Sequence, residues 1–195
     1  MKTYAITGGI GSGKSTLKHW FEKHNIPTLD ADQIAREQVQ PGQPALAAIA
    51  KTFGADFMLK DGHLDREALR QKIFSDQESK TTLESILHPL IRQATAKKLQ
   101  VLADEGHTIA VVEIPLLIET GKPDYIDKVI LSDCSPSQQI ARVQRRSHWR
   151  YEDIANVMKQ QTARKDRYQH ADIIIDTSAD LTSVELQLQH HFPKL

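Results

Sequence analysis

A glycine-rich loop near the N-terminus, residues 7–16 (TGGIGSGKST), constrains the fold of this 195-residue chain more than any other segment. The loop follows an apolar run at residues 4–6 and precedes a stretch with helical periodicity, residues 15–24. Four of its positions match the G-x-x-x-x-G-K-[ST] pattern of phosphate-binding loops: Gly8, Gly13, Lys14 and Ser15. A strand, this loop and a helix in that order predict nucleoside triphosphate binding at the start of the helix.

The chemistry of such a loop comes mainly from its backbone. Glycines allow successive N–H groups to turn inward and form a concave anion site, and the following helix adds its positive N-terminal end. Lys14 can bring a mobile charge to the β- and γ-phosphates, and the Ser15 hydroxyl can bind Mg²⁺. We therefore expect six residues to hold the nucleotide: Gly11, Ser12, Gly13, Lys14, Ser15 and Thr16.

Apolar runs and helical patterns alternate along the chain. Five short runs are typical of buried strands: residues 3–7, 26–30, 108–114, 128–132 and 172–176. Helical patterns lie between them at residues 15–24, 32–39, 135–146 and 152–167. Strands that alternate with helices in this way imply right-handed crossovers. We predict an α/β P-loop NTPase fold, with a mainly parallel five-stranded sheet flanked by helices.

The alternation stops between residues 40 and 107, where no convincing strand appears. Helical periodicity runs instead through residues 44–53, 66–74 and 77–103, with a turn at Asp61 and Gly62. This stretch predicts a helical insertion at one edge of the sheet.

Composition limits the classes of partner and the compartment. The 25 Lys and Arg residues balance 25 Asp and Glu residues, so no overall charge favours a nucleic acid or a membrane surface. The single cysteine, Cys134, cannot form an internal disulfide, which fits a reducing compartment. The chain reaches its glycine-rich loop within seven residues, so we expect neither a signal peptide nor a membrane span. These features predict a cytoplasmic protein, and no histidine has zinc-site spacing with Cys134.

Carboxylates follow two of the expected strands, at the edge where open parallel sheets usually bind ligands. Asp30 and Asp32 come after the second run, and Glu113 lies near the end of the third. A carboxylate beside the loop can orient an acceptor hydroxyl and take its proton. Either aspartate can alternatively cap the next helix, and Glu113 is either a Walker-B-like acid or a solvent-exposed charge.

Basic residues gather in the C-terminal half of the chain: Arg142, Arg145, Arg146, Arg150, Arg164, Lys165 and Arg167. Neighbouring aromatic residues allow a nucleic-acid surface, but interspersed acids break the basic stripe. A lid that closes over a transferred phosphoryl group is a better use of these arginines. We expect one to three of them to act at the site and the others to be solvated.

Several segments together resemble the dephospho-CoA kinase family, in the right order over almost the whole chain: residues 7–16, 30–32 with 34–36, 87–91, 115–117 with Glu119, and 171–172. The resemblance implies ATP-dependent phosphorylation of the ribose 3′-hydroxyl of dephospho-CoA, the last step of coenzyme A biosynthesis. It implies ATP and Mg²⁺ as cofactors and dephospho-CoA as a small-molecule partner, with no nucleic acid or membrane.

The same resemblance assigns roles to parts of the chain. It implies a nucleotide-binding core (residues 1–39, 108–134 and 168–195), a substrate-binding helical subdomain (40–107) and a lid (135–167), within one kinase unit. Asp32 is then the acceptor-activating carboxylate, His88 lies in the substrate subdomain, and Arg145 belongs to the lid. Together with Lys14, Asp32 and Arg145 form the expected catalytic set. The expected substrate contacts are Asp32 and His88, and the expected metal ligand is Ser15.

The chain departs from the family pattern at two positions. Family members often have Arg-Asp where this chain has Arg145 and Arg146, and many have Asn where it has Thr177. His88 also has a structural alternative. Its side chain, directly before Pro89, can supply a hydrogen bond to a helix that the proline kinks.

Two other functions stay open at this stage: a nucleoside or nucleotide monophosphate kinase, and a P-loop switch that controls a partner. A guanine-specific switch would usually carry Asn-Lys-x-Asp, which is absent here.

Overall fold

The computed structural model describes residues 1–195 and divides into two compact units. The first comprises residues 1–30 and 101–195, and the second comprises residues 31–100. None of the helices combines the length and the apolar character that a membrane-spanning helix needs.

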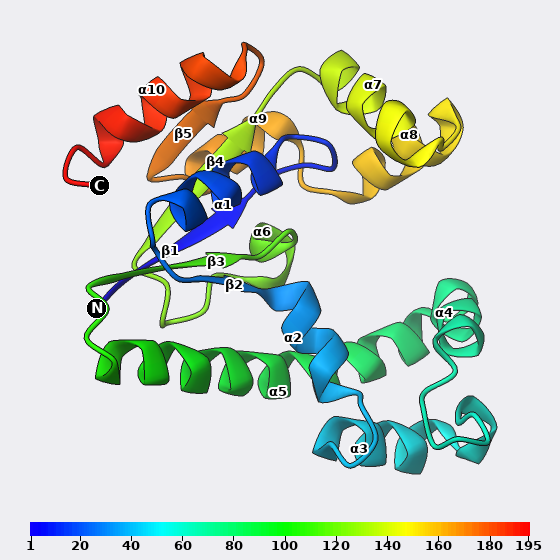
Figure 1. Ribbon diagram of the computed structural model, residues 1–195. Helices are drawn as coiled ribbons and strands as arrows, with labels where there is room; N and C mark the ends of the chain where they lie inside the picture. The colour runs from blue at the N-terminus through cyan, green and yellow to red at the C-terminus, as the bar shows by residue number, and fades with distance from the viewer. The chain divides into compact units, whose positions relative to one another are not determined.

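The first unit is built on a five-stranded sheet (Figure 1). Its strands are β1 (Lys2–Thr7), β2 (Thr28–Asp30), β3 (Ile109–Glu113), β4 (Lys128–Asp133) and β5 (Ile173–Asp176). All neighbouring pairs are parallel, and the order across the sheet is β2-β3-β1-β4-β5. This order places β1 in the centre and confirms the predicted parallel five-stranded sheet.

One face of this sheet is covered by α1 (Lys14–Lys23) and α10 (Leu181–His191), which contact each other. Tyr4 and Ile6 alternate along β1 and point into the core between sheet and helices. Phe192 packs edge-on against Tyr4 and Phe21, with ring centroids 5.1 and 5.0 Å apart. The C-terminal helix therefore closes the core over the central strand. It was missed by the sequence analysis.

The other helices of this unit are α6 (Leu117–Thr120), α7 (Pro136–Ser147), α8 (Tyr151–Gln160), α9 (Arg164–Arg167) and a 3₁₀ turn (Tyr168–His170). A reciprocal capping box between Ser135 and Gln138 starts α7, as the pattern of a hydroxyl residue followed by glutamine favours. The single helix predicted over residues 152–167 is wrong, because extended backbone at Gln161 and Ala163 separates α8 from α9.

The second unit is helical, like the insertion predicted over residues 40–107, but it comprises residues 31–100. It contains α2 (Ala31–Gln38), α3 (Pro44–Phe53), a 3₁₀ turn (Ala55–Phe57), α4 (Arg66–Ser75) and most of α5 (Gln77–Asp104), which runs on into the first unit. Its core gathers Leu46 and Ile49 from α3, Leu69 from α4 and Leu83 from α5. Pro89 lies inside α5 without ending it.

Candidate nucleotide-binding site

The glycine-rich loop lies between β1 and α1, as its sequence predicts. Gly13 adopts a left-handed conformation (φ 97°) directly before α1, a conformation that favours glycine. Gly8 also has a positive φ, and a β-carbon there would collide with the carbonyl oxygen of Ser132 and the hydroxyl of Ser12. Both glycines are therefore required by backbone conformation and by close packing.

Lys14 lies across this loop. Its Nζ donates hydrogen bonds to the carbonyl oxygens of Gly8, at 2.9 Å, and of Gly9, at 3.1 Å. The ammonium group is thus held at the first two glycines of the loop, where the motif needs a cation for phosphate.

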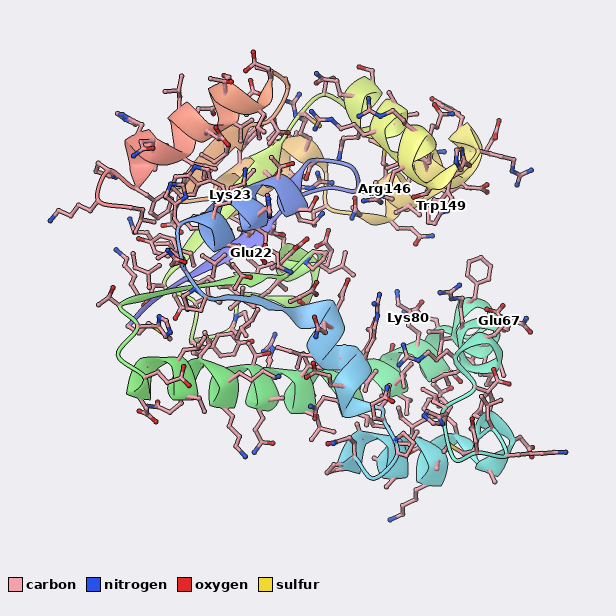
Figure 2. The ribbon with its side chains drawn as sticks, in the orientation of Figure 1. Glu22, Lys23, Glu67, Lys80, Arg146 and Trp149 are labelled. Carbon is pink, nitrogen blue, oxygen red and sulfur yellow. The ribbon has the colours of Figure 1, made fainter.

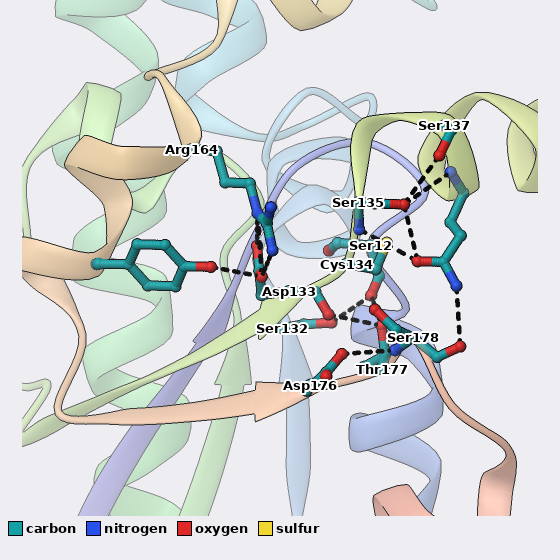
Figure 3. Close-up of polar contacts among 12 residues, drawn as sticks. Ser12, Ser132, Asp133, Cys134, Ser135, Ser137, Arg164, Asp176, Thr177 and Ser178 are labelled. Carbon is teal, nitrogen blue, oxygen red and sulfur yellow. Dashed lines mark hydrogen bonds and ion pairs between the residues drawn. The ribbon is translucent and has the colours of Figure 1, made fainter.

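Two hydroxyl groups from neighbouring strands fix the centre of the loop (Figure 3). The Ser132 hydroxyl, on β4, and the Thr177 hydroxyl, just after β5, each lie 2.6 Å from the carbonyl oxygen of Ser12. Thr177 is almost completely buried, and its side chain also packs near the Cα of Gly13. Thr177, one of the two residues at which this chain departs from the family pattern, is therefore a support for the loop.

Glutamine side chains hold the loop from the other direction. Gln139 of α7 donates to the carbonyl oxygen of Ile10 at 2.7 Å, and Gln161, just after α8, accepts from the Ile10 N–H at 3.0 Å. Both polar groups of one loop residue are thus bonded to the α7–α8 segment. This segment corresponds to the expected lid, and its base is attached directly to the loop.

A cavity of about 580 Å³ opens beside the loop. Its walls include Ser15 and Thr16 from the start of α1 and Leu181 and Val184 from α10. Three arginines of α7 complete it: Arg142, Arg145 and Arg146. The volume lies within the range of small-molecule sites, and the mixture of apolar and cationic walls suits a nucleotide.

The arginines of this cavity differ in their attachment. Arg142 is fixed to Thr177, because its Nη1 lies 3.1 Å from the hydroxyl and its Nη2 donates to the carbonyl oxygen. Arg145 and Arg146 are exposed near the end of α7, and Figure 2 shows Arg146 together with Trp149, which follows the helix. Arg142 is therefore a rigid part of the wall, whereas the other two lie on the outer part of the helix.

Asp133, at the end of β4, is the centre of a second polar cluster (Figure 3). It is 6% exposed and accepts hydrogen bonds from Nε of Arg164 at 2.9 and 3.1 Å and from the Tyr168 hydroxyl at 2.7 Å. The hydrogen bond to Asp133 raises the pKa of Tyr168, and the same carboxylate raises the pKa of Arg164. This cluster fastens α9 to the sheet.

The predicted carboxylates lie in two different settings. Asp30 ends β2 in register with Glu113 at the end of β3, and it lies 3.7 Å from Nζ of Lys18. Asp32 lies in the first turn of α2, in the second unit. The ion pair with Lys18 gives Asp30 a structural partner, while the catalytic role of Asp32 stays a prediction.

His88 is half-buried in α5 directly before Pro89. Its role toward a substrate stays a prediction, as does that of Arg145. Sequence reasoning did not find Gln139, Gln161 or Ser132, and nothing in their local spacing marks them. Their hydrogen bonds to the loop join segments more than 100 residues apart.

The residues near the loop fit a magnesium ion that arrives with a nucleotide. No three acid, histidine or cysteine side chains gather to hold a metal by themselves. The Ser15 hydroxyl lines the cavity, and Mg²⁺ is commonly held by few protein oxygens together with substrate phosphates.

Comparisons with known proteins agree with this geometry. Shikimate kinase from Acinetobacter baumannii, at 16% identity, shares the fold with a TM-score of 0.55 and covers 100% of this chain and 96% of its own. A Thermus thermophilus protein reaches a TM-score of 0.86 at 26% identity, covering 100% of this chain and 97% of its own. Fold and loop together define the class: this is a P-loop protein with the fold that shikimate kinase also has.

The family model described as dephospho-CoA kinase matches residues 3–183. A dephospho-CoA kinase from Hydrogenovibrio crunogenus is 49% identical over 189 residues, covering 97% of this chain and 95% of that protein. One from Yersinia pseudotuberculosis is 43% identical over 194 residues, covering 98% and 93%. The chain belongs to the dephospho-CoA kinase family.

Proposed function

We propose that this protein transfers the terminal phosphoryl group of ATP to the ribose 3′-hydroxyl of dephospho-CoA, giving coenzyme A and ADP in the last step of coenzyme A biosynthesis. The observation that carries the proposal is the family match over residues 3–183. The loop and the adjoining cavity of about 580 Å³ supply a nucleotide site of the kind that this reaction needs.

In this proposal the phosphates lie in the concave backbone of the loop. The ammonium group of Lys14 stays in contact with the phosphoryl group while it is transferred. Ser15 would hold Mg²⁺, which supplies charge neutralisation at the phosphate oxygens. Arg145 neutralises charge that develops during transfer, when the α7–α8 segment closes over the nucleotide. Because this segment is bonded to the loop through Ile10, binding at the loop and closure of the lid are expected to be coupled.

The acceptor side of the proposal rests on the helical residues 40–107, assigned to substrate binding. Asp32 accepts the proton of the ribose hydroxyl and orients its oxygen toward the phosphorus atom. His88 contributes a contact to the substrate from α5. The remaining assignments are a nucleotide-binding core (1–39, 108–134 and 168–195), a lid (135–167) and a cytoplasmic location, which the lone buried Cys134 favours.

A panel of acceptors tests the proposed function. Purified protein with ATP and MgCl₂ is incubated separately with dephospho-CoA, AMP, adenosine and no acceptor, and ADP and phosphorylated product are quantified by chromatography. We expect one ADP per coenzyme A formed, with dephospho-CoA strongly preferred. Preference for AMP would identify a nucleotide monophosphate kinase, and ADP release without a phosphorylated acceptor would point to a switch.

A further inference from the structure

A nearly buried arginine, Arg167, lies against the glycine-rich loop. Its side chain is at the end of α9, and the residue is only 8% exposed. A β-carbon placed on Gly9 would lie 2.5 Å from Nη1 and 3.2 Å from Cζ of Arg167. The guanidinium group therefore packs directly on the Cα of Gly9 and depends on the missing side chain there.

The same glycine contacts a second cation. Nζ of Lys14 donates a hydrogen bond to the Gly9 carbonyl oxygen at 3.1 Å. An ammonium group and a guanidinium group thus both contact Gly9. This residue belongs to a loop whose glycine-rich backbone can bind anions. The two cationic side chains thus approach Gly9 from its carbonyl oxygen and from its Cα, so both lie beside the backbone that the motif offers to phosphate.

The Arg167 side chain makes no ion pair or hydrogen bond with the rest of the chain. Burial lowers its pKa, and the more distant charges of Glu119 and Asp133 only partly oppose this effect. Both acids are engaged elsewhere, since Glu119 accepts from the Thr162 N–H at 2.7 Å and Asp133 accepts from Arg164 and Tyr168. The Arg167 nitrogens keep some access to solvent, because the Ser12 hydroxyl oxygen is the one fully buried side-chain polar atom without a hydrogen-bond partner. A mostly buried cation without a paired anion is costly, which points to an anionic ligand that reaches this group and supplies the charge.

The position of Arg167 is fixed by its neighbours. Arg164 and Tyr168, on either side of it in the chain, are both bonded to the buried carboxylate of Asp133 at the end of β4. These hydrogen bonds join α9 to the sheet whose central strand leads into the loop. The backbone that carries Arg167 is therefore held in place before any ligand binds, and its side chain is packed against Gly9, in contrast to the exposed Arg145 on α7.

We propose that Arg167 binds the terminal phosphate of the nucleoside triphosphate and contacts the phosphoryl group during its transfer. This deepens the proposed function and rests on it for the transfer step. Arg167 is preorganised, and it adds a fixed positive charge to that of Lys14. A planar guanidinium group can donate two parallel hydrogen bonds to phosphate oxygens, which a lysine cannot.

Equilibrium binding of nucleotides tests this assignment without any acceptor. Arg167→Gln is titrated with ADP and with AMP-PNP, an analogue that carries a third phosphate, in the presence of MgCl₂. We expect a loss of about 10- to 100-fold in affinity for AMP-PNP, the range for charge-assisted hydrogen bonds, and a change of less than about threefold for ADP. The control is Lys165→Gln, which removes the same charge from an exposed residue of α9 and should alter neither affinity.

Two further measurements separate phosphate binding from support of Gly9. Arg167→Lys keeps a charge but loses the forked donor, so its AMP-PNP affinity should fall between those of wild type and Arg167→Gln, with ADP unaffected. In Arg167→Ala, millimolar guanidinium should restore part of the lost AMP-PNP affinity. If Arg167→Gln fails to fold, these two variants still test whether Arg167 binds the terminal phosphate.

Equal losses for ADP and AMP-PNP, or no loss for either, would overturn the proposal and leave Arg167 as a support for the loop. Because no acceptor is present, this outcome is independent of the acceptor panel. If dephospho-CoA is not phosphorylated but Arg167→Gln selectively loses affinity for AMP-PNP, the proposed function fails while the phosphate contact stands.

Discussion

The hydroxyl of Thr177 donates a 2.6 Å hydrogen bond to the backbone carbonyl oxygen of Ser12. This bond joins the end of β5 to the glycine-rich loop across 165 residues of sequence. The same hydroxyl lies 3.0 Å from the carbonyl oxygen of Asp133, at the end of β4. One buried side chain therefore ties two strand ends to the loop.

Thr177→Val tests this support, because valine keeps the shape and removes the hydroxyl. The Ser12 carbonyl oxygen loses one of its two donors and Arg142 loses an acceptor, so we expect the free energy of unfolding to fall by about 1–2 kcal/mol. The KM for ATP should rise roughly fivefold, since a loosened loop pays more entropy on binding. Thermal unfolding and steady-state kinetics measure the two effects. Thr182→Val, at an exposed position of α10, is the matched control, and unchanged stability and KM in Thr177→Val would refute the supporting role.

Lys14→Ala should leave a folded protein with very little phosphoryl transfer. The ammonium group is bonded to the loop carbonyls of Gly8 and Gly9, and its loss removes a charge from the expected phosphate site. We predict a fall in kcat of about 10²–10³-fold, typical of one lost electrostatic contact. Circular dichroism checks the fold, and Lys51→Ala, on exposed α3 surface, should keep wild-type turnover. Near-normal turnover in Lys14→Ala would remove the lysine from the mechanism.

Asp32→Asn should lower transfer to dephospho-CoA while ATP still binds. Asparagine has nearly the same size, but it cannot accept the proton of the ribose hydroxyl. General-base help is worth about 10²–10⁴-fold in rate, so the loss should appear in kcat. Asp30→Asn is the control, since Asp30 is paired with Lys18 at 3.7 Å and should have a smaller effect. An active Asp32→Asn variant would show that another group takes the proton.

Arg145→Ala should lower kcat more than it weakens ATP binding, because a lid arginine acts mostly as the transition state forms. We expect a reduction of about 10²-fold or more in kcat. Arg146→Ala, at the position that departs from the family pattern, should do much less. Both side chains line the same cavity, so the two variants each remove one arginine from similar surroundings. Equal kinetic effects of the two changes would show that the lid arginine is wrongly assigned.

The sequence predicts most of the fold because the strands and the loop have strong local signals. All five strands appear where apolar runs occur, with ends shifted by one or two residues. The shift at β4 matters, because the predicted strand ends at Ser132 and so leaves out Asp133. This buried carboxylate ends the observed strand and binds Arg164 and Tyr168. α10 was missed since Leu181 and Leu186, which are 54% and 66% exposed, blur the period set by the buried Val184 and Leu188.

The support of the candidate site is less predictable than its motif. The glycine spacing identifies the loop, but Gln139, Gln161 and Thr177 act on it through hydrogen bonds between distant segments. No local propensity encodes such pairs. The basic cluster was visible in the sequence, whereas only burial and the contact with Gly9 distinguish Arg167 from the exposed Lys165.

The position of the new phosphate on the product tests the central claim most directly. Dephospho-CoA is converted with ATP and MgCl₂, and the purified product is analysed by phosphorus and proton NMR. The account predicts one additional phosphomonoester, coupled to the ribose 3′-proton, in amounts equal to the ADP formed. A phosphate on the 2′-oxygen or elsewhere on the molecule, or ADP formed without a phosphorylated product, would contradict it.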